Sequence, residues 1–199
     1  MTELDLNRVG VPLGWTEIFG RVAPVDVEIG SGKGRFLLEL AATHPERSFL
    51  AVERAGKYFK LCRDRAERRG LDNVRMLRTT AEDLLFRLLA EASVASFYVL
   101  FPDPWPKKRH HKRRLIKGEV VAAIGRALVP DGRLLIKTDH EGYAEVIEEV
   151  LGTVAGFHRL DPDDAFAGLP ITGFEHKYID QGRAIHAFAL ERIVERPVS

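Results

Sequence analysis

Residues 101–114 combine an isolated carboxylate, a tryptophan and a dense block of positive charge. They read Phe-Pro-Asp-Pro-Trp-Pro-Lys-Lys-Arg-His-His-Lys-Arg-Arg. The three prolines fix their own backbone φ angles and bias the preceding residues toward extended conformations, so Asp103 and Trp105 are held in place without helical support. This combination predicts a functional site.

The charge of the chain is unevenly distributed, although its formal net value is only +1. Residues 107–117 contain seven Lys or Arg and no Asp or Glu, which leaves 23 basic and 29 acidic residues elsewhere, a balance of −6. A focused basic patch favours local contact with phosphate over general coating of nucleic acid or membrane. The alternative is an ordinary solvated face of the protein.

A glycine-rich segment follows an early apolar stretch and precedes apolar residues at helical spacing. Gly30, Gly32 and Gly34 would let a ligand approach the backbone closely. Their spacing is one residue short of the dinucleotide pattern, and Lys33 lacks the context of a phosphate-binding P-loop.

Two acidic residues point toward S-adenosylmethionine as the ligand. Glu28 lies at the end of the first apolar stretch, where an anion would repel a pyrophosphate but attract the α-ammonium of a methionine moiety. Glu53 ends the next stretch, where such folds use an acid to accept hydrogen bonds from ribose hydroxyls. The alternatives are a half-buried salt bridge for Glu28 and a helix N-terminal acid for Glu53.

The elements that must position these residues alternate along the chain. Expected strands cover residues 25–29, 48–52, 74–77, 96–101, 133–138, 157–160 and 185–193, and expected helices cover 36–42, 54–69, 81–91, 115–128 and 141–151. This alternation predicts an α/β fold with a doubly wound, mostly parallel seven-stranded sheet and an antiparallel C-terminal edge. Ligands of such folds bind at the carboxyl ends of the strands.

Composition limits how many domains, disulfides, metal sites and membrane spans the chain can have. Residues 1–24 are expected to form an arm laid over a single domain, residues 25–199. Cys62 is the only cysteine and the histidines are scattered, so we expect no disulfide and no metal site. No apolar run is long enough for a membrane span and the N-terminus is too polar for a signal peptide, so a cytoplasmic location is expected.

Residues 27–34, Val-Glu-Ile-Gly-Ser-Gly-Lys-Gly, together with residues 101–114 give the chain a specific resemblance. It resembles the bacterial tRNA (guanine-N7)-methyltransferases of the TrmB family from about residue 18 to the end. The resemblance implies a Rossmann-like, S-adenosylmethionine-dependent methyltransferase that modifies N7 of a guanine in the variable loop of tRNA, giving m7G46. The tRNA is then the partner, and either a monomer or a homodimer is compatible.

The same resemblance implies a role for individual residues. S-adenosylmethionine would contact Glu28, Gly30, Gly32, Gly34, Glu53, Thr80 and Asp103. The target nucleotide would contact Lys107, Asp139, Thr172, Gly173, Phe174 and Glu175, and the RNA backbone would contact Arg109, His110, His111, Lys112, Arg113 and Arg114. Thr80 departs from the Asp or Asn that is common in the family, and the N-terminal arm is shorter.

The chemistry requires positioning more than proton transfer, because guanine N7 already presents a lone pair. Asp103 is the catalytic candidate, since a carboxylate stabilises the positive charge that develops on the base; it could equally orient the cofactor. Asp139 or Glu175 could accept the N1–H and amine donors of guanine. Alternatively, Thr172 and Glu175 form a capping box and Asp139 caps a helix, and Trp105 either stacks on a base or braces the proline-rich segment.

Other functions remain compatible with the residues alone. The same scaffold could methylate another RNA base or a small molecule. A non-catalytic RNA-binding module would need only the basic segment. Binding of NAD without S-adenosylmethionine would instead indicate a dehydrogenase.

Overall fold

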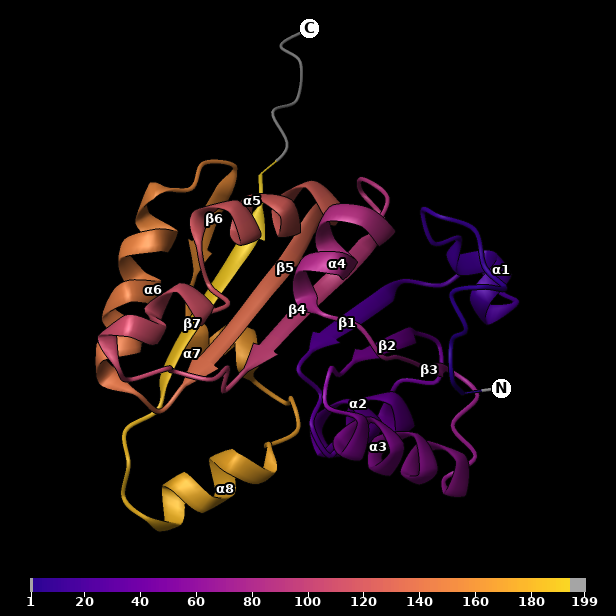
Figure 1. Cartoon of the computed structure of the whole chain (residues 1–199), viewed down its shortest axis with the longest axis horizontal. Coiled ribbons are helices and arrows are strands. Elements are labelled where there is room, and N and C mark those ends of the chain that lie inside the picture. The colour runs from indigo at the N-terminus through magenta and orange to yellow at the C-terminus, as the bar shows by residue number, and fades with distance from the viewer. Residues whose placement is uncertain (1, 194–199) are drawn as a thin grey trace, which may run out of the picture.

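The computed structural model describes residues 2–193, which form one seven-stranded sheet with helices on both faces (Figure 1). The strands lie in the order β3-β2-β1-β4-β5-β7-β6. Their bounds are β1 Val25–Ile29, β2 Ser48–Val52, β3 Val74–Leu77, β4 Val94–Leu100, β5 Leu128–Thr138, β6 Phe157–Leu160 and β7 His186–Arg192. β7 is antiparallel to both β5 and β6, which confirms the predicted mostly parallel sheet with an antiparallel edge.

The helices are α1 Trp15–Phe19, α2 Arg35–Thr43, α3 Gly56–Arg68, α4 Ala81–Asp83, the π-helix η1 Leu84–Leu88, the 3-10 helix η2 Lys108–Arg113, α5 Gly118–Ala127, α6 Glu141–Thr153, α7 Pro162–Phe166 and α8 Gly173–Asp180. Five predicted helices are present as α2, α3, α4 with η1, α5 and α6, whereas α1, η2, α7 and α8 are not among the predicted helices. Among residues 2–193, no helix is long and apolar enough to cross a membrane.

Apolar side chains alternate between the two faces of the sheet, because successive strand residues point in opposite directions. Val25 and Val27 pack with the apolar faces of η1, α5 and α6 on one side. Phe49 and Ala51 pack with α2 and α3 on the other side. Both faces are therefore covered, which explains why β1 and β2 are buried along their whole length.

Two of the predicted elements differ clearly in form or extent. The helix expected over residues 81–91 is a short α4 followed by η1, whose wider turns bury Leu84, Leu85 and Leu88 completely. β5 begins at Leu128 rather than Arg133, and its pairing with β4 is irregular between Val94 and Ser96. Tertiary packing decides both features, because neither the π-turn nor the strand irregularity changes the hydrophobic period of the sequence.

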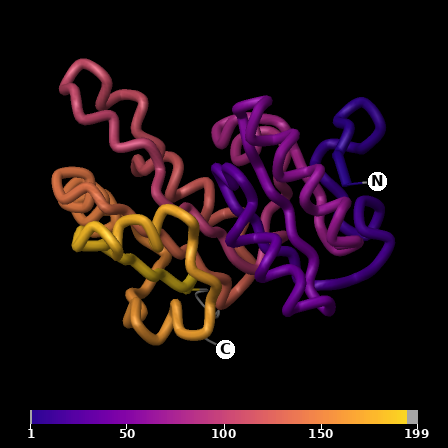
Figure 2. The backbone as a smooth tube through the Cα atoms, turned by 90° about the horizontal axis from the view of Figure 1, so that it is seen from below, coloured from indigo at the N-terminus to yellow at the C-terminus, as the bar shows by residue number. Residues whose placement is uncertain are grey.

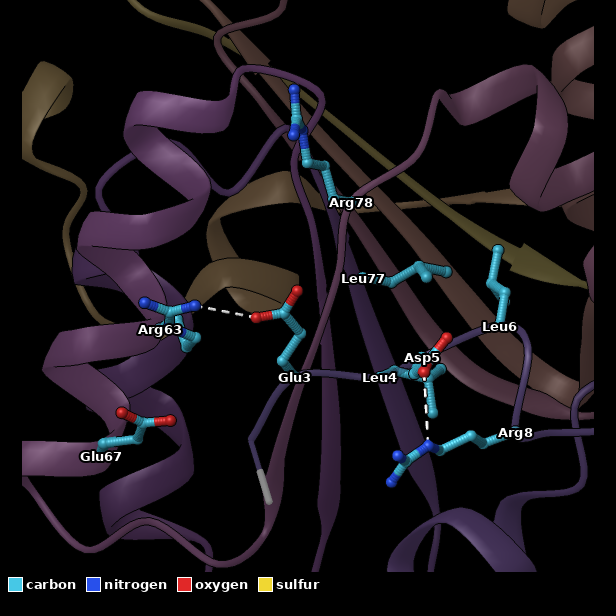
Figure 3. Close-up of a pocket in the computed structure, with 9 residues that line it drawn as sticks. All are labelled: Glu3, Leu4, Asp5, Leu6, Arg8, Arg63, Glu67, Leu77 and Arg78. Carbon is cyan, nitrogen blue, oxygen red and sulfur yellow. Dashed lines mark hydrogen bonds and ion pairs between the residues drawn. The ribbon is translucent and has the colours of Figure 1, made fainter.

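The first residues of the chain lie beside β3. The Met76 amide donates to the Thr2 carbonyl at 2.7 Å, and the Leu4 amide donates to the Met76 carbonyl at 2.8 Å. Glu3 pairs with Arg63 of α3 at 2.8 Å, at a hollow of about 580 Å³ between this segment and α3 (Figure 3). These contacts tie the segment to the edge of the sheet.

Candidate active site

The carboxyl ends of the parallel strands bring the predicted site residues to one edge of the sheet. β1 pairs with β2 and β4, so the residues that follow these three strands are neighbours. Glu28, Glu53, Thr80, Asp103 and Asp139 all lie at or just beyond strand ends on this edge. In Figure 1, α8 lies below the arrowheads of β1 and β4, next to the same edge.

The glycine segment combines an open backbone with one tight packing position. Gly30 and Gly32 have φ angles of +82° and +54°, and a Cβ at Gly30 would meet nothing within 4 Å. Gly34 has a φ of +73°, and a Cβ there would lie 2.2 Å from Cys62 Sγ. Gly30 and Gly32 therefore leave room for a ligand, whereas Gly34 allows α2 to pack against α3.

Glu28 is a buried acid whose pKa is strongly raised. It is 4% exposed, and its Oε2 has no hydrogen-bond partner; neither does the buried Ser31 Oγ. Burial, with a smaller contribution from Glu53, raises the pKa of Glu28 to about 8. Within residues 2–193 Glu28 forms no ion pair, so the alternative of a half-buried salt bridge is wrong. An orphaned acceptor beside open glycine backbone fits the cationic ammonium of S-adenosylmethionine.

Glu53 holds the glycine segment in position. Its Oε2 accepts from the Gly32 amide at 2.9 Å and its Oε1 from the Ala55 amide at 2.7 Å, just before α3 begins. Glu53 therefore also has the role that the alternative interpretation gave it, that of an acid at the N-terminus of a helix. Each carboxylate oxygen has a second lone pair, so ribose hydroxyls can still donate to Glu53.

Thr80 has a structural partner at this edge. Its hydroxyl caps α4 by accepting from the Asp83 amide at 3.1 Å. Asp83 in turn accepts from Thr79 at 2.8 Å and pairs with Arg87 at 2.7 Å. The residue that departs from the family pattern therefore begins a helix, as threonine does at many N-caps.

The proline-rich segment after β4 is strained and braced. Phe101 and Trp105 have φ angles of +55° and +44°, which bulky residues rarely adopt, and the exposed Asp103 lies between them. Arg114 is 5% exposed; its Nε donates to the Pro104 carbonyl at 2.9 Å and its guanidinium lies 4.9 Å from the centre of the Tyr143 ring. These contacts support the loop that presents Asp103.

Two predictions about this segment are sharpened by these contacts. Trp105 meets His110 edge-on at 5.7 Å and Arg113 at 4.9 Å, so it acts as a brace in this structure. The prediction for Arg114 is corrected. The sequence predicts an RNA contact, but the guanidinium is buried because it supports the loop from inside. The charged residues before it lie on η2, in the pink segment that projects from the rest of the tube in Figure 2.

A capping box and an ion pair hold the start of α8. The Glu175 amide donates to Thr172 Oγ1 at 2.9 Å, the Thr172 amide donates back to Glu175 Oε2 at 3.4 Å, and Glu175 also pairs with Lys137 at 2.5 Å. The capping-box alternative is confirmed. Between these two residues, Phe174 is 56% exposed and lies 6.4 Å from the ring of Phe101.

Asp139 is held by a cation and does not cap α6. Its Oδ2 lies 2.5 Å from Arg183 Nη2, and the N-cap of α6 is His140, whose ring accepts from the Tyr143 amide. The prediction of an Asp139 cap is therefore wrong by one residue. Sequence reasoning missed Lys137 and Arg183, although Lys137 immediately precedes Thr138-Asp139 at a strand end, where site residues gather.

An open α/β sheet with a glycine turn after β1, an acid near the end of β1 and another directly after β2 defines the class of Rossmann-like methyltransferases. The family model described as "Putative methyltransferase" matches residues 22–188. The chain is 43% identical over 192 residues to a tRNA (guanine-N(7)-)-methyltransferase of Mycobacterium avium. The alignment covers 92% of this chain and 72% of that protein. The chain belongs to the tRNA (guanine-N7)-methyltransferase family.

One further relative agrees with this family assignment, and two solved structures are similar in fold alone. A tRNA (guanine-N(7)-)-methyltransferase of Nitrosococcus oceani is 40% identical over 186 residues, covering 92% of this chain and 78% of that protein. The crystal structure of the 16S rRNA methyltransferase KamB has a TM-score of 0.62 at 18% identity, with 90% of this chain and 93% of that chain covered. TrmN from Thermus thermophilus has a TM-score of 0.60 at 19% identity, with 89% and 47% covered. These two structures share the fold.

Proposed function

We propose that this protein transfers a methyl group from S-adenosylmethionine to N7 of a guanine in the variable loop of tRNA, at position 46. The observation that carries the proposal is the 43% identity over 92% of the chain to a protein named for this reaction. A cytoplasmic location is part of the proposal, since the substrate is tRNA.

Glu28, Gly30, Gly32 and Glu53 would hold the cofactor, which supplies an electrophilic methyl group when bound. The ionised Glu28 pairs with the ammonium group and is stabilised by it, so binding releases the proton that burial otherwise retains. Glu53 keeps the glycine turn in shape through Gly32 while accepting from the ribose.

The target guanine would meet groups that are already ordered. Asp139 and Glu175 keep their cationic partners, Arg183 and Lys137, and use remaining lone pairs to accept the guanine donors. The exposed ring of Phe174 offers a stacking surface for the base, next to Gly173 and Thr172. Lys107, at the start of the basic segment, lies exposed for the nucleotide's phosphate.

Asp103 would act directly on the reaction. Positive charge develops on the base as N7 is methylated, and a carboxylate fixed nearby stabilises that charge without moving. The left-handed residues on either side and the buried Arg114 keep Asp103 in place, so its orientation is set before the tRNA arrives. Residues Arg109 to Arg113 contact the RNA backbone.

The test is methyl transfer from labelled S-adenosylmethionine to tRNA that lacks the modification. The label should map to the variable-loop guanine, and tRNA carrying 7-deazaguanine at that position should take none. Label on adenine, on a ribose or on the 7-deaza tRNA would contradict the proposal.

A further inference from the structure

A second basic region lies outside the predicted site, between the start of α2 and the last turns of α3. Five cationic residues line a hollow of about 380 Å³ there: Lys33, Arg35, Arg65, Arg68 and Arg69. Gly34 and Leu38 complete its lining, which contains no acidic residue. This surface is called the basic hollow below.

The cations of the basic hollow lack acidic partners. Within residues 2–193, none of the five forms an ion pair. Arg63, on the same helix α3, shows the contrast: it pairs with Glu3 at 2.8 Å and with Asp64 at 2.9 Å. Like charges gathered in a concavity raise the local positive potential, which attracts an external anion.

Helix stability explains only part of this arrangement. Arg65 and Arg68 lie in the last turn of α3, where cations are favoured by the helix dipole. Lys33 and Arg35 flank the N-terminus of α2, the positive end of that dipole, and no acid occupies its first turn. Cations at this position are disfavoured by the helix dipole. An anion that binds here is therefore stabilised both by the cations and by the positive end of the dipole.

The basic hollow is partly preorganised and borders the target site. Arg65 Nη1 donates to the Lys33 carbonyl at 2.8 Å, which fixes α3 against the glycine segment. The stem of Arg35 lies beside the start of α8, since a Cβ at Gly173 would be 3.7 Å from Arg35 Cδ. The hollow therefore adjoins the segment that the proposed function assigns to the target nucleotide.

We propose that the basic hollow binds backbone phosphates of the tRNA and forms a second RNA contact, separate from residues 107–113. The assignment rests on the proposed function. Arginine forks match phosphate oxygens in geometry and charge, and several cations around one concavity suit a polyanion better than a single carboxylate. Such contacts are independent of sequence and strengthen binding at low salt.

The test compares the double variant R68Q/R69Q with wild type and with R133Q/R159Q. Arg133 and Arg159 are exposed and form ion pairs elsewhere, so their replacement removes the same charge from other surfaces. R68Q/R69Q should weaken tRNA binding about tenfold and make the plot of log affinity against log salt shallower by about 1 for each phosphate that is no longer neutralised. Its kcat at saturating tRNA and its calorimetric affinity for S-adenosylmethionine should equal those of wild type.

The outcomes separate the two proposals. If wild type methylates tRNA but R68Q/R69Q keeps the affinity and salt dependence of R133Q/R159Q, the basic hollow is not an RNA contact. If R68Q/R69Q lowers kcat at saturating tRNA instead of affinity, the same conclusion holds. Wild-type protein that transfers no methyl group to tRNA would refute the proposed function, and the assignment of the hollow with it.

Discussion

The basic loop, residues 107–113, and the basic hollow carry similar charge but are built differently. The loop takes its cations from consecutive residues on η2, which projects from the fold. The hollow takes them from the start of α2 and the end of α3, and the two residues joined by the bond from Arg65 to the Lys33 carbonyl lie 32 positions apart in the chain. A projecting loop can adapt to RNA, whereas a concave surface is preformed for it.

The two regions also differ in what accompanies the charge. The loop follows shortly after Asp103 and the strained residues Phe101 and Trp105, so the proposed RNA contacts and the catalytic candidate share one segment. The hollow contains no carboxylate and no strained aromatic residue. We therefore expect changes at Asp103 or at its support by Arg114 to affect the rate of methyl transfer. Changes to the charges of the loop or of the hollow should affect tRNA affinity.

The largest effect is expected from D103A. Loss of a preorganised charge at the reacting base should lower kcat by about 10²- to 10³-fold, with the affinity for tRNA and its salt dependence unchanged. Single-turnover methylation measures the rate, and filter binding measures the affinity. A comparable loss of kcat in R68Q/R69Q would break the division of roles between the two regions.

The glycine segment between the two regions provides a pH test. Because the folded-state pKa of Glu28 is raised to about 8, the contribution of this group to stability is fully present below its ordinary pKa and is lost as the pH rises from there to 8, where only the unfolded state ionises freely. E28Q cannot ionise, so at pH 8 it should be more stable than wild type by on the order of 3 kcal/mol, with a smaller difference at pH 5. Urea unfolding at both pH values measures this.

The same variant separates the cofactor from the RNA. E28Q should bind S-adenosylmethionine more weakly, because the ammonium loses its anionic partner, and should bind tRNA with the salt dependence of wild type. Calorimetry at pH 7 and pH 8 should show wild-type affinity for the cofactor rising with pH. Equal unfolding profiles of wild type and E28Q would contradict the ionisation assigned to Glu28.

Combining the two basic regions tests whether they act separately. R109Q/K112Q removes charge from the loop, and each double variant should weaken tRNA binding about tenfold. The quadruple variant should then lose about a hundredfold, because distant contacts contribute additively to the binding free energy. A quadruple variant no weaker than either double variant would show that the two regions do not bind independent phosphates.

The smallest expected effect comes from R114K, which keeps the charge of the loop but removes the planar group. Lysine cannot reproduce the Nε bond to Pro104 and the packing on Tyr143 together. Because Asp103 would be held less firmly, kcat should fall about tenfold while tRNA affinity stays near that of wild type. R109Q is the matched control and should show the opposite pattern.

Much of the fold follows from local patterns. Val25–Ile29, Ser48–Val52 and Val74–Leu77 have the predicted bounds, because short apolar runs between turn residues specify buried parallel strands. The capping box at Thr172 and Glu175 was also readable, since three-residue spacing is local. The short α4 with η1 and the early start of β5 could not be predicted from the sequence, because packing against distant residues decides them.

For the site, the sequence by itself identified the candidate residues for the chemistry: the glycines, Glu28 and Glu53, and the proline-held Asp103. It also determined the basic loop, since consecutive charges need no fold to be found. Only the tertiary structure decided that Arg114 braces the loop from inside, that Arg183 holds Asp139, and that cations of α2 and α3 meet in the basic hollow. The physical reason is that burial and charge pairing depend on which residues are neighbours in space. Residue spacing along one element does not specify those neighbours.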